Sequence, residues 1–211
     1  MADLGLGSLI ELKRQLLSSD LASRTTWDVQ ATAIGKGVAK SFDKYCNRIF
    51  ARGSSITDQF TADRASWVLS RYPVETISAL DMRSDMNLGW VSMGLVNTVL
   101  QNRDDAAGII HFGAVQGGCY DQIRVTYAGG YYYDSSEDAS GSLPSGATAL
   151  PDDIKTAWFM QSLHLWECQD PVGGAPSTGS VAHNTDVRIG NLSMVPEVVK
   201  ILEGYVRMNL T

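Results

Sequence analysis

The side chains best suited to acid–base catalysis are Asp104, Asp105 and His111, which stand close together in the sequence. Two carboxylates beside an imidazole could supply the general acid and the general base of a hydrolase. Successive residues of a strand point to opposite faces of the sheet, so these groups would converge on one pocket only with difficulty. A turn that leads into a strand explains the acid pair better. A hydrolase is therefore the third of three hypotheses for this chain.

Other catalytic motifs are missing from the sequence. There is no GxxxxGK[ST] phosphate loop, no strand-flanked GxGxxG and no GxSxG nucleophile elbow. The histidines and cysteines are too scattered for a metal site or a disulfide framework: His111, His164, His183, Cys46, Cys119 and Cys168. We expect no enzymatic activity, no cofactor and no metal. The cysteine pattern also favours a reducing compartment.

A row of basic residues is the most regular charged feature. Within residues 26–52, Lys or Arg recurs at every fourth position: Lys36, Lys40, Lys44, Arg48 and Arg52. Side chains four apart lie on neighbouring turns of a helix, so these five would form a ladder. The ladder is either a solvated helix face or a surface that binds a partner. We take it as the candidate assembly interface.

The ladder requires a long helix, and the apolar pattern predicts one. Apolar residues recur at steps of three and four, which is the period of one buried helix face: Ala31, Ile34, Val38, Phe42, Tyr45 and Ile49. The helix should end near Arg52–Gly53 and be about 40 Å long. Shorter helices are predicted over 8–18, from Pro151 to about 169, and from Pro196 onward, and the second of these is apolar on most sides.

Residues 54–134 change to the two-residue period of strands, and six or seven short strands are predicted there. Residues 88–94 and 95–102 should pair and meet at Gly94. Tyr131, Tyr132 and Tyr133 could stack on sugars or bases, although a surface strand end is the simpler interpretation. Two turn-rich loops, 135–149 and 169–192, separate this part from the later helices.

Charge is distributed unevenly along the chain. Residues 1–55 carry eight Lys or Arg and five Asp or Glu, whereas the whole chain has a net charge of −6. A chain that is basic at one end and acidic elsewhere suits stacking on its own copies or on charged partners. The overall acidity disfavours general nucleic-acid binding. No signal peptide or membrane span is predicted, so we expect a soluble protein that is made inside the cell.

The predicted fold class is α+β. A helical bundle, in which the long N-terminal helix packs with two C-terminal helices, carries an inserted small antiparallel β domain. We expect a single domain over 1–211. It comprises N-terminal helices at 1–53, a β-rich insertion at 54–134, and C-terminal helices at 150–211.

Six phrases of the sequence, taken in order, resemble the head–tail connector (adaptor) proteins of tailed bacteriophages. They cover nearly the whole chain: CNRIF (46–50), SRYPVETISAL (70–80), AGIIHFG (107–113), IRVTYAGGYYY (123–133), LPDDIKTAW (150–158) and PEVVKILEGYVR (196–207). The sequence departs from the family pattern in its longer segments at 86–103, 135–149 and 169–192. Gly204 also stands where the family pattern has a proline or alanine before its final tyrosine.

The resemblance implies a non-enzymatic virion protein at the head–tail junction, assembled in the host bacterial cytoplasm. Such subunits form a closed ring, typically of twelve copies, between the portal protein and tail or stopper proteins. DNA passes through the ring without sequence-specific binding, and no membrane is involved. The basic ladder would then face a neighbouring subunit or the portal, with channel lining as the second choice. The alternative function is a small β-domain module that binds carbohydrate or another ligand.

Overall fold

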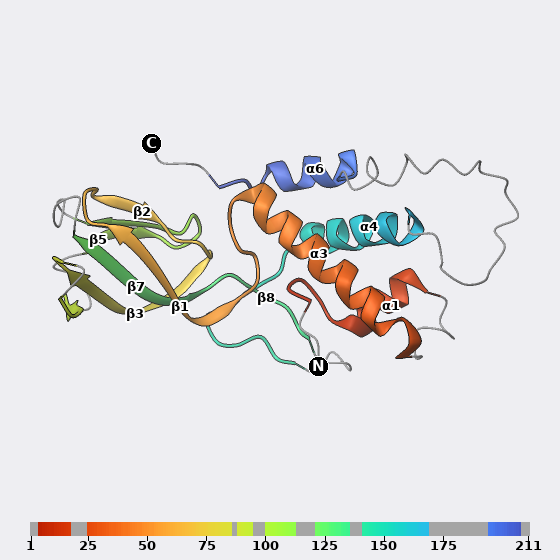
Figure 1. Cartoon of the computed structure of the whole chain (residues 1–211), viewed down its shortest axis with the longest axis horizontal. Helices are drawn as coiled ribbons and strands as arrows, with labels where there is room; N and C mark the ends of the chain where they lie inside the picture. Colours follow the sequence, from red (N-terminus) through yellow and green to blue (C-terminus); the bar gives the residue numbers. More distant parts are fainter. Residues whose placement is uncertain are drawn as a thin grey trace, which may run out of the picture. The chain divides into compact units, whose positions relative to one another are not determined.

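Helices come first and last along the chain, and strands lie between them in the computed structural model (Figure 1). The structure describes residues 4–17, 25–85, 88–94, 100–112, 121–135, 141–168 and 194–207. The helices and one 3-10 turn are α1 (Leu9–Leu16), η1 (Thr25–Trp27), α3 (Asp28–Cys46), α4 (Asp152–Cys168) and α6 (Pro196–Glu203). The strands are β1 (Gly53–Thr61), β2 (Ser66–Val68), β3 (Val74–Arg83), β4 (Val91–Ser92), β5 (Leu100–Asp104), β6 (Ile109–Phe112), β7 (Gln122–Gly129), β8 (Tyr131–Tyr132) and β9 (Thr148–Ala149). The predicted α+β class is confirmed.

Two compact units are built from interleaved parts of the chain. The helical unit comprises Met1–Phe42, Ser135–Ser140 and Pro151–Tyr205. The β unit comprises Asp43–Asp134, Gly141–Leu150 and Val206–Thr211. Among the described helices, none combines the length and the apolar character that crossing a membrane requires.

Trp158 of α4 is the centre of the helical unit. Its ring is fully buried, and its indole Nε1 donates a hydrogen bond to the Gly35 carbonyl of α3 at 3.0 Å. A Cβ at Gly35 would lie 3.1 Å from the Trp158 ring, and one at Gly7 would lie 2.7 Å from it. Both contacts are closer than ordinary van der Waals packing, so these two glycines let backbone approach the indole.

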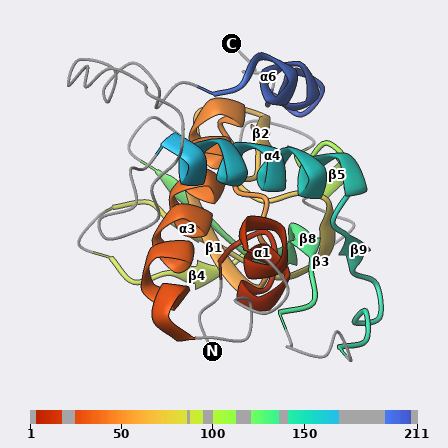
Figure 2. The same ribbon diagram turned by 90° about the vertical axis from the view of Figure 1, so that its right-hand side faces the viewer.

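The final helix packs on α4, as its apolar stripe predicts. Figure 1 and Figure 2 both show α4 between α1 and α6, and α4 contacts each of them. Val198 and Leu202 of α6 are fully buried. The Gln161 side chain accepts a hydrogen bond from the Val195 amide at 2.8 Å, just before α6 begins. At the other end of α6, the Tyr205 hydroxyl donates to the Asp153 carboxylate at 2.9 Å.

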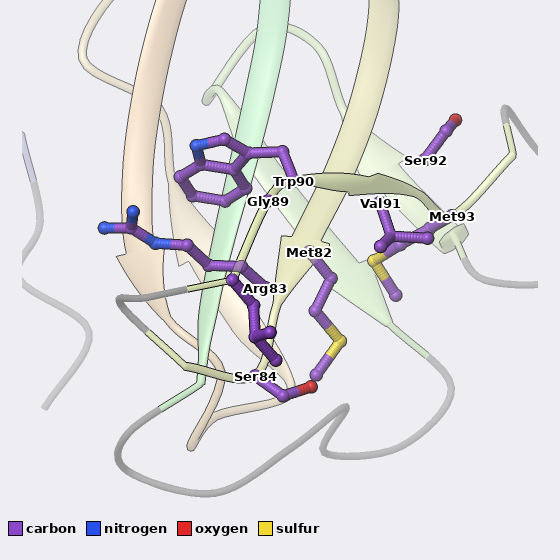
Figure 3. A pocket seen from close by; sticks show the side chains of 9 residues that line it. Met82, Arg83, Ser84, Gly89, Trp90, Val91, Ser92 and Met93 are labelled. Atoms are coloured by element: carbon purple, nitrogen blue, oxygen red, sulfur yellow. The ribbon is translucent and has the colours of Figure 1, made fainter.

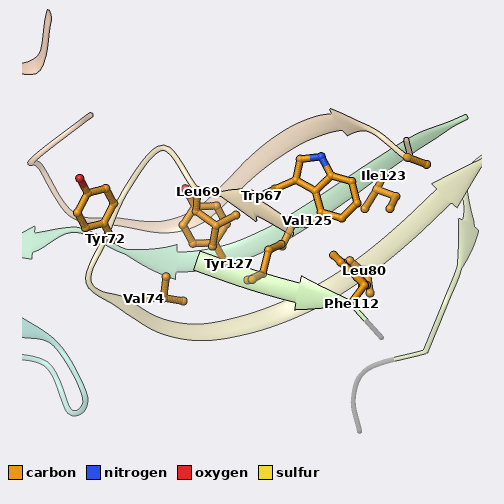
Figure 4. Close-up of a cluster of buried hydrophobic side chains, with 11 residues drawn as sticks. Trp67, Leu69, Tyr72, Val74, Leu80, Phe112, Ile123, Val125 and Tyr127 are labelled. Carbon is orange, nitrogen blue, oxygen red and sulfur yellow. The ribbon is translucent and has the colours of Figure 1, made fainter. Parts of the chain in front are cut away.

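The β unit contains a four-stranded sheet in the order β1-β7-β3-β4 and a three-stranded sheet in the order β2-β6-β5. Both sheets are antiparallel. Side chains of β7 alternate between buried and half-buried, so the buried ones form one face of the sheet. Figure 4 shows the buried side chains Ile123, Val125 and Tyr127 of β7 in one cluster with aromatic and aliphatic side chains from β2, β3, β6 and the segment after β2: Trp67, Leu69, Val74, Leu80 and Phe112.

The long helix is shorter than predicted, because α3 ends at Cys46 and does not reach Arg52. Asn47 has a φ of 51°, the left-handed conformation that commonly ends a helix. The Asp43 carboxylate then accepts a hydrogen bond from the Phe50 amide at 3.0 Å, which fixes the chain as it leaves the helix. Apolar residues continue to recur at helical spacing past Cys46, but the backbone is no longer helical there.

The predicted pairing of residues 88–94 with residues 95–102 is also wrong. β4 pairs with β3, and β5 pairs with β6. Residues 95–99, between them, lie outside the described residues, as do 136–140 and 169–193, which hold part or all of the two predicted loops. The described part of the first loop contains β9, which pairs in parallel with β8.

Candidate assembly surface

Three members of the basic ladder lie on one exposed side of α3: Lys36, Lys40 and Lys44. The opposite side is buried, and it contains four of the six predicted core positions: Ala31, Ile34, Val38 and Phe42. Among the described residues, none of the three lysines takes part in an ion pair. Their charges therefore face solvent, and they are available to a partner.

Arg48 does not belong to this surface, because its side chain is buried in the β unit with 5% of its surface exposed. Its guanidinium lies 3.4 Å from the centre of the Tyr72 ring, with Phe50 and Tyr131 about it at 4.9 and 5.2 Å. It also donates a hydrogen bond to the Tyr72 carbonyl. Stacking on aromatic faces compensates in part for burying this charge.

Arg52 does not belong to this surface either, because its guanidinium pairs with Glu75. Its Nε lies 2.6 Å from Oε1 of Glu75, and a second guanidinium nitrogen lies 2.8 Å from Oε2. This two-point pairing joins the segment after α3 to β3, and it raises the pKa of Arg52. The five-residue ladder is thus reduced to three lysines, because it depended on a helix that continued past Cys46.

Two titratable groups near the end of α3 are shielded from water. Burial raises the pKa of the Asp43 carboxyl, although the Phe50 amide, Arg71 and Arg48 act in the opposite direction. Burial also raises the pKa of the Cys46 thiol to about 12. Since the thiolate is the reactive form, Cys46 is a core residue and not a nucleophile at neutral pH.

The hydrolase candidates do not form one site. Asp104 is exposed at the end of β5 and accepts a hydrogen bond from the Ala107 amide at 3.1 Å, as in a turn. His111 lies elsewhere on β6, with its Nδ1 2.7 Å from the hydroxyl of Ser66 on β2. This serine–histidine pair was not predicted from the sequence, because only strand register places the two residues opposite each other. Among the described residues, no group of three or more His, Cys, Asp and Glu could hold a metal ion.

The tyrosines proposed as a ligand platform have structural partners. The Tyr131 ring stacks on Phe50, with ring centres 6.3 Å apart and planes 20° from parallel. The Tyr132 carbonyl accepts a hydrogen bond from the Leu150 amide at 2.8 Å. Both residues form β8, so they join segments of the β unit as a strand end would.

A pocket at the turn between β3 and β4 was not predicted from sequence. It encloses about 500 Å³ and is lined by Trp90 and by residues on both sides of the turn (Figure 3). The guanidinium groups of Arg83 and Arg124 lie 4.7 and 4.6 Å from the centre of the indole ring. Arg124 also pairs with Asp81 at 2.6 Å. The indole is therefore already in contact with the protein's own cations.

Comparison with solved structures shows that this fold has counterparts. One is a chain in the neck of an empty GTA particle, computed with C6 symmetry. It is 14% identical with a TM-score of 0.61, and the match covers 100% of this chain and 94% of that chain. Another is a chain in the virion of the native gene transfer agent (GTA) particle, with the same identity and coverage and a TM-score of 0.60. At this identity the likeness establishes a shared fold. No protein-family model matches the sequence, and no curated protein does.

Proposed function

We propose that this chain is a structural subunit of the neck of a phage-like particle, where it forms a connector ring between the head and the tail. The observation that carries the proposal is the fold shared with a GTA neck chain over the whole length of the protein. A match that covers both the helical and the β parts is more informative than a match to one common motif.

In this proposal the ring lies beneath the portal protein, contacts tail or stopper proteins on its other side, and surrounds the DNA channel. The copy number is twelve, as in the connector family that the sequence resembles. DNA passes through without sequence-specific recognition, because the chain carries a net charge of −6.

The exposed lysines of α3 are the part of the predicted interface that we retain for assembly. They are solvent-facing charges on a rigid helix, whereas Arg48 and Arg52 stabilise the β unit. Lys36, Lys40 and Lys44 are proposed to contact a neighbouring subunit in the ring.

Electron microscopy of tail-bearing particles tests the function directly. We expect a ring between portal and tail whose density accommodates this chain, and an antibody or tag on the chain should label the neck. Particles that lack the chain should contain filled heads without attached tails. A chain that is absent from the neck would refute the proposal. Binding of a carbohydrate by a monomer would instead favour the β-domain module.

A further inference from the structure

The exposed side of α4 carries acidic residues around an apolar centre. Met160 and Leu163 are 36% and 37% exposed, although both are large hydrophobic side chains. Asp152 and Glu167 are exposed near the two ends of the same helix. None of the exposed residues of α4 is a cation, since Lys155 is half-buried and paired with Glu11 at 2.6 Å. We call this side the α4 face.

The exposed side of α3 has the opposite charge. Lys36, Lys40 and Lys44 lie on it, and it includes Val29, which is 84% exposed. None of the exposed residues of α3 is acidic, because Asp28 and Asp43 are half-buried. We call this side the α3 face. Both faces combine charges of one sign with exposed apolar atoms, and the opposite signs make the two faces electrostatically complementary.

The two faces cannot meet within one molecule. α3 and α4 already contact each other through their buried sides, where Trp158 bonds to the Gly35 carbonyl. Their exposed sides therefore point away from this contact. Complementary surfaces that occupy different parts of one subunit make head-to-tail contacts, and such contacts generate rings or filaments.

We propose that the α3 face of one copy docks on the α4 face of the next copy, and that this contact repeats around the ring. The inference rests on the proposed function and names the partner of the exposed lysines. The helices have matching lengths, since α3 has 19 residues and α4 has 17. The lysines would pair with Asp152 and Glu167, while Met160 and Leu163 would bury their apolar atoms against α3.

Charge reversal on each face tests this contact. One variant carries Lys36→Glu and Lys40→Glu, and a second carries Asp152→Lys and Glu167→Lys. Each variant alone should associate at least tenfold more weakly than the unchanged chain, because like charges then meet at the interface. Sedimentation velocity of the purified full-length chain measures this, and circular dichroism checks that each variant is folded. The single change Glu167→Lys provides a milder variant in case Asp152→Lys disturbs the start of α4.

Mixing the two variants gives the decisive result. Each copy of the first variant has two acidic faces, and each copy of the second has two basic faces. An equal mixture should therefore recover oligomers in which the variants alternate. Lys200→Glu and Glu203→Lys on the exposed side of α6 are matched controls and should associate as the unchanged chain does. Normal association of either single-face variant, or no recovery on mixing, would overturn the proposal.

Cross-linking distinguishes a head-to-tail contact from a two-fold one. Cys168 is exposed at the end of α4, so Lys36→Cys or Lys44→Cys would place a second thiol on the α3 face. Cys119→Ser removes the third cysteine of the sequence, and Cys46 is buried. A bifunctional maleimide should produce covalent trimers and larger species with one of these variants. Products that stop at dimers, or a ladder with the Lys200→Cys control alone, would contradict the model.

Failure of this contact can be separated from failure of the function. If particles contain a neck ring made of this chain, and both charge variants enter it normally, the contact is wrong and the function stands. If the chain is absent from the neck, the proposed function fails. The mixing experiment on the purified chain then decides the α3–α4 contact by itself.

Discussion

At the scale of residues, the Asp58 carboxylate on β1 accepts three hydrogen bonds that connect separate segments of the β unit. It accepts from the Ser70 amide at 2.7 Å, from the Ser70 hydroxyl at 2.9 Å and from the Tyr127 hydroxyl at 2.8 Å. The Tyr127 oxygen in turn accepts from the Arg71 amide at 3.0 Å. One carboxylate therefore joins β1, β7 and the segment after β2.

This network makes the protein sensitive to alkali. Burial, with the nearby Asp58 charge, raises the pKa of Tyr127 from 10.0 to about 12, and burial raises that of Cys46 from 9.0 to about 12. At a pH between the ordinary pKa of each group and its raised pKa in the folded protein, the unfolded chain loses a proton that the folded chain retains. The free energy of unfolding therefore falls as pH rises. We expect the urea midpoint to decrease from pH 9 to pH 12. Tyr127→Phe should reduce this slope and cost about 1–3 kcal/mol at neutral pH, since Asp58 loses a donor. If Tyr127→Phe left the pH dependence of the urea midpoint unchanged, folding would not shield the Tyr127 hydroxyl from deprotonation.

Gly35 and Gly37 form a matched pair two residues apart on α3. A Cβ at Gly35 would lie 2.8 Å from Leu12 Cδ2, whereas a Cβ at Gly37 meets nothing within 4 Å. Gly37→Ala should therefore stabilise the chain by up to about 1 kcal/mol through helix propensity. Gly35→Ala should destabilise it by about 1–3 kcal/mol through overpacking. Thermal unfolding of both variants checks the pair, and equal effects would contradict the packing described here.

Arg48 shows where prediction from sequence stops at this scale. Its spacing from Lys44 is that of a helix face, and the sequence therefore placed it in the ladder. Its actual environment depends on Tyr72 and Tyr131, which are distant in sequence and come near only after the β unit folds. Spacing predicts neighbours on one element, but it cannot predict contacts that tertiary structure creates.

At the scale of elements, α6 gives the clearest link between pattern and stability. Leu202 is fully buried where α6 packs on α4. Leu202→Ala should cost about 2–5 kcal/mol in the free energy of unfolding, because it removes buried methyl groups and leaves a cavity. Val206→Ala, at a 45% exposed position, is the control and should have little effect. A cost near zero at Leu202 would mean that α6 is not packed in solution.

Helices were easier to predict than the partners of strands. The apolar period predicted α1, α3, α4 and α6, although it placed the end of α3 near Arg52 instead of at Cys46, and Pro196 marked the start of the last helix. Strand existence followed from alternation, but the pairing of β4 with β3 did not. A two-residue strand carries too little pattern to specify its partner, so register depends on the whole sheet.

At the scale of the whole molecule, assembly through the α3 and α4 faces should depend on salt. The contact joins exposed lysines to exposed carboxylates, and salt screens such charges. Raising the salt concentration from about 0.1 M to about 1 M shortens the screening length from roughly 10 Å to roughly 3 Å. Oligomers of the purified chain should dissociate over this range, as measured by sedimentation velocity. In the variant with Lys36→Glu and Lys40→Glu, this dissociation with rising salt should be weaker or reversed. Oligomers of the unchanged chain that do not respond to salt would indicate a mainly apolar contact.

The interleaving of the two units sets an order for folding during synthesis. The ribosome completes β1, β3 and β7 by residue 129, so the main sheet can pair while the later helices are still absent. The helical unit must wait, because α1 and α3 need Trp158 of α4, and α4 needs α6. The contacts of α1 and α3 with α4 span more of the chain than the pairings of β1 and β3 with β7 do. The nascent chain therefore exposes the apolar sides of α1 and α3 until α4 has emerged, and it is during this interval that chaperones or neighbouring nascent copies would act.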